Sequence, residues 1–346
     1  MIPIADTFSP EVKDTELIIR SLRSQPMISR IMKPNLLPLL SLSLVVVSLS
    51  RGQDPARGGA TGGRAAENSH GSAAAQLKQI GPRPAFADLA YANESPAEKL
   101  DLYLPPPSTA PAPLVIWIHG GGFMAGDKRS MPRRDFGPAP KPTSMMGPYQ
   151  IQVPDVAALT AKGYAVVSLN YRLGASMFDA AYPALRDGKA AVRFLRANAD
   201  TYHLDSSKFA VWGNSAGGYM AAMLGVTGDQ ATAFDDPGLG NAGVSSAVQA
   251  VVVWYGAEDR LPDPKLSIVH YLPMAKILPA FRIVNGDADQ IISPAQARRL
   301  HEALTKAGAI STLTILPGAG HEDPAYMATQ MVPTLAFLDH ILFAHN

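Results

Sequence analysis

The fold of this chain is decided by the stretch Phe209-Ala-Val-Trp-Gly-Asn-Ser-Ala-Gly-Gly-Tyr-Met220. Its first residues form a short apolar run, which predicts a buried strand, and its last residues favour a helix. Between the two lies Gly213-Asn-Ser-Ala-Gly217, a G-x-S-x-G pattern. A serine at such a sharp strand-to-helix turn points away from the sheet, and the first N–H groups of the helix face whatever it attacks. Both glycines are expected to be needed because the strand and helix backbones pass close to the turn.

Composition narrows the class of protein. The chain has 346 residues, of which 47% are hydrophobic and 17% are charged, and its formal net charge is +1. This is typical of one large α/β domain or two small ones, and the lack of a basic stripe argues against nucleic acid as a partner. The sequence has no cysteine, which excludes disulfides, thiolate zinc sites and a cysteine nucleophile. No clustered motif such as H-E-x-x-H implies a metal, and no cofactor is expected.

The N-terminal part differs from the rest. Residues 1–50 are interpreted as an N-terminal extension with a secretory signal peptide, because an apolar run over 36–49 follows basic residues and ends at small serines. A run of about 14 residues is too short for a membrane span, although a buried strand or helix would look similar. We therefore expect a secreted or periplasmic protein whose translation starts at Met27 or Met32. Residues 51–82 are rich in Gly, Ala, Ser and Arg, and predict a disordered linker.

Residues 83–346 predict one folded domain in which strands and helices alternate. The first two strands favour an antiparallel entry pair, and the alternation that follows indicates a mostly parallel central sheet of about eight strands flanked by helices. The predicted strands are 86–91, 99–104, 113–119, 164–170, 209–212, 248–254, 280–285 and 313–316, and the predicted helices are 153–162, 183–198, 219–224, 294–307 and 323–343.

Three further segments lie directly after predicted strands, where open α/β sheets place their ligands. They are His119-Gly-Gly-Gly-Phe123, Asn285-Gly-Asp-Ala-Asp-Gln290 and Gly318-Ala-Gly-His321. A glycine run after a strand lets backbone N–H groups face a ligand without obstruction by a Cβ. A serine on a turn, an acid and a histidine thus follow separate strands, and this chain order is associated with α/β-hydrolases.

From about residue 84 to its end, the sequence resembles the α/β-hydrolase superfamily. More narrowly, it is similar to the bacterial esterase/lipase branch with an HGGG loop and a G-x-S-A-G-G turn, which includes hormone-sensitive-lipase-like, feruloyl/acetylxylan-type and arylformamidase-like enzymes. The segments Asp101-Leu-Tyr-Leu-Pro105, Asn170-Tyr-Arg-Leu173 and Val192-Arg-Phe-Leu-Arg196 carry the same resemblance. It implies the α/β-hydrolase fold, and the short segment 256–278 implies little or no cap domain.

The resemblance also implies roles for individual side chains. Ser215 would be the nucleophile, His321 the base that takes its proton, and Asp289 the acid that orients the imidazole. Asp287 competes with Asp289 because both lie in one turn, and the family spacing of glycine, two residues and then the acid favours Asp289. More distant alternatives follow the preceding strand, namely Glu258 and Asp259.

Further positions are assigned around these three. The resemblance places an oxyanion hole at the backbone N–H groups of Gly121, Gly122 and Ala216. His119 is expected to hold the glycine loop in place rather than to act as a second base. The long proline-rich segment 128–154 is a candidate pocket wall, with a floppy surface insertion as the alternative. Substrate contacts are expected from Phe123, Asn214, Met145 and Tyr149, with Met146 as a further apolar contact.

The sequence therefore predicts a carboxylic-ester hydrolase that forms an acyl-enzyme and acts on short-chain or aryl-type esters, either small or linked to a polymer. One alternative is an arylformamidase-like amidase, which would use the same groups on a different bond. An alternative from another class is a non-catalytic hydrolase fold that serves as a binding protein; such proteins usually lack a member of the triad. The sequence does not indicate an oligomeric state.

Overall fold

The computed structural model describes residues 82–128, 154–228, 230–256 and 261–343, all within a compact unit that spans Gly71–Asn346. The predicted signal peptide and nearly all of the predicted linker lie outside the described residues. Most of the proline-rich segment, with Met145, Met146 and Tyr149, also lies outside the described residues. So do the more distant alternative acids, Glu258 and Asp259. Within the described ranges, no helix is both long enough and apolar enough to cross a membrane.

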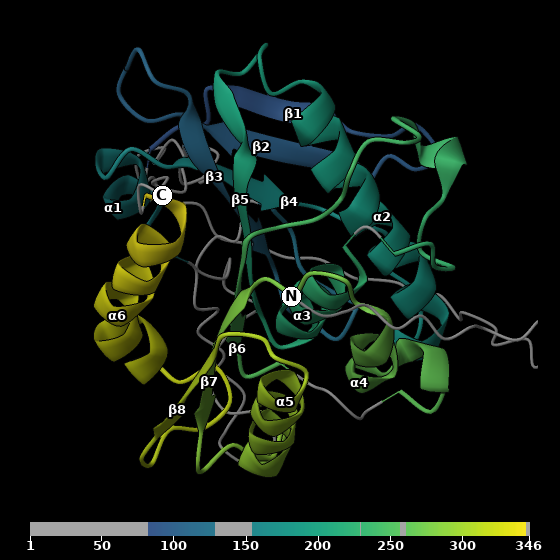
Figure 1. Cartoon of the computed structure of the whole chain (residues 1–346), viewed down its shortest axis with the longest axis vertical. Helices are drawn as coiled ribbons and strands as arrows, with labels where there is room; N and C mark the ends of the chain where they lie inside the picture. The colour runs from purple at the N-terminus through teal and green to yellow at the C-terminus, as the bar shows by residue number, and fades with distance from the viewer. Residues whose placement is uncertain (1–81, 129–153, 229, 257–260, 344–346) are drawn as a thin grey trace, which may run out of the picture. The chain divides into compact units, whose positions relative to one another are not determined.

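The described residues contain eight strands that form one sheet (Figure 1). They are β1 (Phe86–Ala90), β2 (Lys99–Tyr103), β3 (Ala112–Ile118), β4 (Ala165–Leu169), β5 (Leu204–Asn214), β6 (Ala250–Trp254), β7 (Ala280–Gly286) and β8 (Ser311–Leu316). Their order across the sheet is β1-β2-β4-β3-β5-β6-β7-β8. β2 runs antiparallel to both of its neighbours, and all other pairs are parallel. The predicted antiparallel entry pair and the mostly parallel sheet are confirmed.

Helices cover both faces of this sheet (Figure 1). They are α1 (Val156–Ala161), α2 (Met177–Ala197), α3 (Ala216–Thr227), α4 (Ile268–Tyr271), α5 (Pro294–Lys306) and α6 (Ala325–Leu342), with short 3-10 helices η1 (Pro237–Leu239), η2 (Pro264–Leu266) and η3 (Leu272–Met274). Side chains of α2, α3 and α5 share one hydrophobic core, and those of α1 and α6 share the other. Every residue of β3, β4, β6 and β7 is buried, which explains why their sequences are predominantly apolar.

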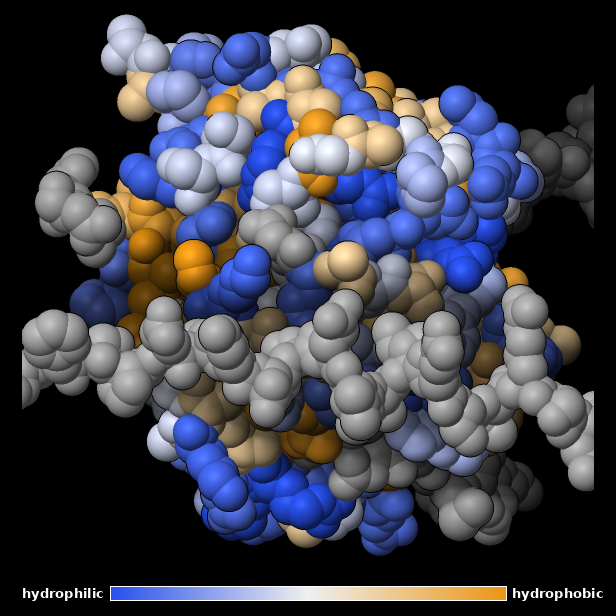
Figure 2. Space-filling view, turned by 45° about the vertical axis from the view of Figure 1, so that its right-hand side comes forward, coloured by the Kyte–Doolittle hydropathy of each residue, from blue (hydrophilic) through white to orange (hydrophobic). Residues whose placement is uncertain are grey.

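The outer surface is of mixed character. On the face shown in Figure 2, hydrophilic residues cover most of the described surface, and apolar residues show in separate groups among them. Such scattered apolar exposure is ordinary for folded proteins.

Several elements extend beyond their predicted ends, α2 and β5 by the most residues. α2 begins at Met177 instead of residue 183, because Ser176 caps it by accepting a hydrogen bond from the backbone N–H of Asp179, and Pro183 is accommodated inside the helix. β5 begins at Leu204 instead of residue 209. Its first residues include polar ones, which hydropathy does not identify, although main-chain pairing extends back to Leu204 opposite Ala112.

The start of α3 lies tightly against the ends of β3 and β5. A Cβ on Gly213 would collide with the carbonyl oxygen of Gly217, and a Cβ on Gly217 would collide with that of Ile118. Neither glycine has a positive φ, so both are required for space and not for backbone conformation. The expected close passage of strand and helix at this turn is confirmed.

Replacing Gly217 with Ala should lower the free energy of unfolding by about 1–3 kcal/mol or more, because the new methyl group has only backbone atoms to displace. The measurement is urea unfolding followed by circular dichroism. Gly320→Ala is the matched control, since a Cβ there would meet no atom within 4 Å. Equal stability of the two variants would contradict the close packing described here.

Candidate active site

Ser215 lies on the turn between β5 and α3, with φ 51° and ψ −121°. A non-glycine residue in this region of backbone space carries strain on the order of 1–3 kcal/mol, which the surrounding structure must offset. Part of that support is a hydrogen bond from the N–H of Ser215 to the carbonyl oxygen of Trp254, at 3.0 Å. The side chain of Ser215 does not cap α3, so its hydroxyl is left for another partner.

That partner is an imidazole from the far end of the chain. Nε2 of His321 lies 3.0 Å from Oγ of Ser215, and Nδ1 of His321 lies 2.9 Å from Oδ2 of Asp289. With the imidazole proton on Nδ1, the ring donates to the carboxylate and accepts from the serine hydroxyl. The structure thus brings together three predicted side chains from three loops, after β5, β7 and β8.

The two competing acids in the turn after β7 have different partners. Oδ1 of Asp289 accepts hydrogen bonds from the backbone N–H groups of Ile291 (2.9 Å) and Ile292 (2.8 Å), which leaves Oδ2 to face the imidazole. Asp287 instead accepts from the N–H of Gly318, at 2.6 Å. The carboxylate in contact with His321 is therefore that of Asp289, as the glycine spacing favoured.

Sequence reasoning missed Tyr255, which directly follows β6. Its ring packs edge-to-face against the imidazole of His321, with 4.8 Å between ring centroids, and it is fully buried. Its hydroxyl accepts a hydrogen bond from Nδ2 of Asn214, at 3.0 Å. Burial raises the pKa of Tyr255 well above its usual value, so the phenol stays neutral. A single aromatic residue after a strand has no pattern from which this contact could be predicted.

Two loops contribute backbone donors beside Ser215. The N–H groups of Gly121 and Gly122 have no acceptor in the described part of the chain, and the N–H of Ala216 opens α3. The loop is folded back on itself, because the N–H groups of Met124 and Ala125 donate to the carbonyl oxygen of Gly121. Gly121 has φ 108°, and a Cβ there would collide with the carbonyl group of Ala125.

Two expected substrate contacts prove to be structural. The amide of Asn214 is fully buried, and its Oδ1 accepts from the N–H of Gly120 at 2.9 Å while its Nδ2 donates to Tyr255. Phe123 is buried between the rings of Tyr171 and Tyr219, each 6.0 Å away between centroids. Both side chains support the loops beneath the site, which corrects their assignment as substrate contacts.

His119 holds the base of the glycine loop, as its expected structural role requires. It is buried, its Nδ1 lies 2.8 Å from the carbonyl oxygen of Gly120, and its ring stacks on Tyr171 at 4.4 Å. A Cβ on Gly126 would collide with the imidazole, so the loop closes directly over this ring. Burial lowers the pKa of His119, and its contact with the Gly120 carbonyl only partly opposes that shift.

The other end of the loop is fastened by Lys128. Its ammonium group lies 2.6 Å from Oδ1 of Asp101 and 2.8 Å from Oδ1 of Asp88, and its side chain is 6% exposed. Its backbone N–H donates to Asn170, and its carbonyl oxygen accepts from Ser168. Burial lowers the pKa of Lys128, but the hydrogen bonds and charges of the two aspartates outweigh burial and raise it. In the sequence, Lys128 marks only the start of the proline-rich segment.

This arrangement can activate a hydroxyl and receive negative charge on an oxygen atom beside it. Within the described ranges, no group of three or more histidine, aspartate or glutamate side chains could hold a metal ion.

Fold and site together define the class. The chain has the α/β-hydrolase fold and is similar to esterases with that fold. More narrowly, its residues 100–139 and 143–265 match the BD-FAE family model.

Curated relatives of this chain include mycobacterial esterases. Esterase LipC of Mycobacterium tuberculosis is 28% identical over 265 residues, which cover 66% of this chain and 58% of LipC. Esterase LipQ of the same organism is 24% identical over 277 residues, which cover 70% of this chain and 59% of LipQ. The aligned region thus spans less than two thirds of either relative.

Solved structures with the same fold are also esterases. A truncated carbohydrate esterase from gut microbiota is 25% identical, with a TM-score of 0.58 over 75% of this chain and 96% of that one. The apo form of Thermogutta terrifontis esterase 2 is 22% identical, with a TM-score of 0.60 over 77% of this chain and 98% of that one.

Acidification should destabilise the protein partly through His119. Because burial lowers the pKa of this imidazole below its usual 6.5, the unfolded chain binds a proton that the folded protein rejects. Stability from this residue is therefore present above pH 6.5 and is lost as the pH falls through the interval down to the folded-state pKa. Urea unfolding at pH 7 and pH 5 should show a smaller acid-induced loss for His119→Gln than for wild type; equal losses would exclude this role.

Lys128→Met should lower the free energy of unfolding by about 3–5 kcal/mol, because it leaves the buried carboxylate of Asp101 without its cation. It should also speed hydrogen–deuterium exchange in the peptide that covers residues 119–127. The double variant Lys128→Met/Asp101→Asn removes the uncompensated charge and should recover part of the stability. If the double variant is less stable than Lys128→Met, the ion pair is not what fastens this loop.

Proposed function

We propose that this protein is a carboxylic-ester hydrolase with Ser215 as its nucleophile. The observation that carries the proposal is the continuous hydrogen-bonded chain from Ser215 through His321 to Asp289, beside backbone N–H groups that have no acceptor among the described residues. A serine hydroxyl is a weak nucleophile near neutral pH and needs a base within hydrogen-bonding distance, which His321 supplies.

The reaction follows from these positions. Oγ of Ser215 attacks the ester carbonyl carbon while its proton passes to Nε2 of His321, and the carboxylate of Asp289 stabilises the imidazolium. The N–H groups of Gly121, Gly122 and Ala216 donate to the developing oxyanion. His321 then protonates the leaving alcohol as the carbon–oxygen bond breaks. Water, activated by the same imidazole, attacks the acyl-enzyme and releases the acid.

The substrate class we propose is short-chain or aryl-type acyl groups on a bulky alcohol such as a carbohydrate. Between α3 and β7 the helices of the described residues have only three or four residues each, so they provide no large lid over the sheet edge. The similarity to a gut-microbiota carbohydrate esterase supports a carbohydrate as the alcohol part.

Ser215→Ala should reduce kcat/KM for p-nitrophenyl acetate by about 10⁴-fold or more, because it removes the atom that attacks. Asp289→Asn should cost up to about 10⁴-fold by favouring the wrong imidazole tautomer, whereas Asp287→Asn, in the same turn, is the matched control and should stay within about tenfold of wild type.

Undiminished turnover by Ser215→Ala would remove the nucleophile assignment, and a larger loss for the control than for Asp289→Asn would reverse the assignment of the acid. N-formylkynurenine serves as the competing substrate. A kcat/KM higher for this formamide than for every ester tested would replace the esterase proposal with an amidase.

A further inference from the structure

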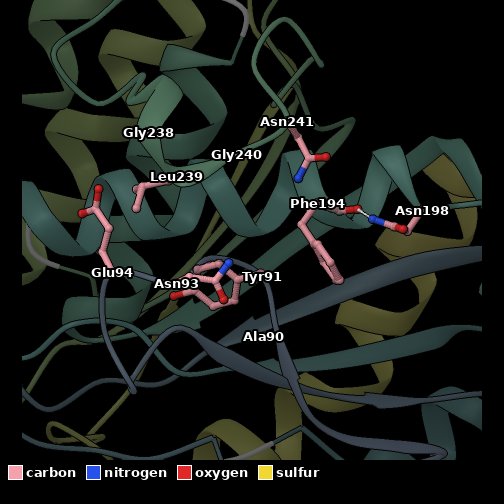
Figure 3. A pocket seen from close by; sticks show the side chains of 10 residues that line it. All are labelled: Ala90, Tyr91, Asn93, Glu94, Phe194, Asn198, Gly238, Leu239, Gly240 and Asn241. Carbon is pink, nitrogen blue, oxygen red and sulfur yellow. Dashed lines mark hydrogen bonds between the residues drawn. The ribbon is translucent and has the colours of Figure 1, made fainter.

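A concave site lies beside β1, and Ser215 is not part of its lining. It has a volume of about 460 Å³, within the range of about 300–1,000 Å³ typical of small-molecule pockets. The end of β1, the last turns of α2 and the loop around η1 form its walls (Figure 3). Its lining includes none of the residues assigned above to the reaction.

The lining of this pocket is rich in neutral hydrogen-bonding groups. The side-chain amides of Asn93 and Asn241 make no hydrogen bond to another residue in the described part of the chain. Asn198 uses its Nδ2 to donate to the carbonyl oxygen of Phe194 at 2.8 Å, which leaves its Oδ1 available. An amide offers both donors and acceptors, so it can bond to hydroxyl groups in either sense.

The charge and polarity of the lining argue against two other ligand classes. Among the lining residues that the structure describes, only Glu94 is charged, and it pairs at 3.1 Å with Arg172, which is not part of the lining. Among the described lining residues there is no lysine or arginine, which argues against a phosphate or carboxylate ligand. The three asparagines argue against a lipid chain, because their amides would be left without partners.

An aromatic surface completes the lining. In Figure 3 the ring of Phe194 projects from α2 into the space between Asn241 and Ala90. Phe194 is only partly buried, so part of its side chain is accessible. The C–H groups on one face of a sugar ring carry partial positive charge and pack favourably on the negative face of an aromatic ring. Amides around an aromatic ring, without net charge, are suited to a neutral ligand with many hydroxyl groups.

We propose that this pocket binds a sugar unit of a neutral polysaccharide and forms a second contact for the polymer whose ester the active site cleaves. Tyr91 follows β1, which runs parallel to β4, so this end of the pocket lies at the same sheet edge as Ser215. The hydroxyl of Tyr91 donates to the carbonyl oxygen of Asn170, whose side chain accepts from Lys128 at the end of the glycine loop. Binding itself is independent of the proposed esterase activity, whereas the link to the polymer ester rests on it.

Three variants test the pocket. Asn241→Gly removes an amide and suits the positive φ of 50° at this position, and Asn93→Ala removes another. Ala90→Arg fills the pocket from an exposed residue. Its matched control is Ala307→Arg, an exposed alanine that ends α5 at the opposite edge of the sheet.

Binding is measured by isothermal titration calorimetry with xylohexaose and with cellohexaose, which does not require turnover. At least one of the two should bind wild type and Ala307→Arg equally. Its affinity should fall roughly threefold to tenfold for each asparagine variant, since each loses a hydrogen bond, and should be abolished by Ala90→Arg. If neither sugar binds wild type, or if Ala90→Arg binds like its control, the proposal is overturned.

Kinetics then connect the pocket to catalysis. Ala90→Arg should raise KM for acetylated xylan while leaving kcat/KM for p-nitrophenyl acetate within about twofold of wild type. Sugar binding by a protein that hydrolyses no ester would refute the proposed function but retain the pocket. Ester hydrolysis without sugar binding would refute the pocket proposal but retain the proposed function.

Discussion

The close contact between the first turn of α3 and the ends of β3 and β5 is the constraint on which the site depends. Without side chains at Gly213 and Gly217, the helix begins directly beside the carbonyl oxygen of Ile118. That position forces Ser215 into a positive φ and turns its hydroxyl away from the sheet. It also brings the first N–H of α3 next to the glycine loop that follows β3. The hydroxyl of Ser215 and the backbone donors are thus adjacent because two glycines let three chain segments meet.

The buried amide of Asn214 couples the remaining parts. Its Oδ1 accepts a hydrogen bond from the N–H of Gly120, and its Nδ2 donates to the hydroxyl of Tyr255. The ring of Tyr255 in turn packs against His321. The glycine loop and the imidazole are therefore positioned from the same side chain, which is itself fixed at the end of a central strand. Side chains that are fixed by packing and by a second layer of hydrogen bonds keep reacting groups within a fraction of an ångström of the positions that the reaction requires.

Much of this architecture could be predicted from the sequence, for identifiable reasons. Buried parallel strands are predominantly apolar runs, so β3, β4, β6 and β7 were recognisable. The chain order of Ser215, Asp289 and His321 indicated where three loops would meet. What could not be predicted is the direction of a side chain on an irregular turn. Asn214 and Phe123 adjoin functional backbone, yet both point into the interior.

Contacts between side chains of distant segments could not be predicted from the sequence either. Lys128 and Asp101 are 27 positions apart, and nothing local in either segment marks them as an ion pair. Tyr255 meets His321 only because β6 and the loop after β8 end at the same edge of the sheet. Such pairings follow from the fold and not from any short pattern, which is why they emerge only once the strands are arranged in space.

The two hydrogen bonds of Asn214 have a consequence for how this sequence can diverge. Residue 214 occupies a position that the G-x-S-x-G pattern leaves unspecified, so it looks free to vary. In this fold, a change there removes the hydrogen-bond partner of both the N–H of Gly120 and the phenol of Tyr255 in the interior. The fold therefore ties the side chain at position 214 to the residue at 255, even though the G-x-S-x-G pattern leaves position 214 unspecified.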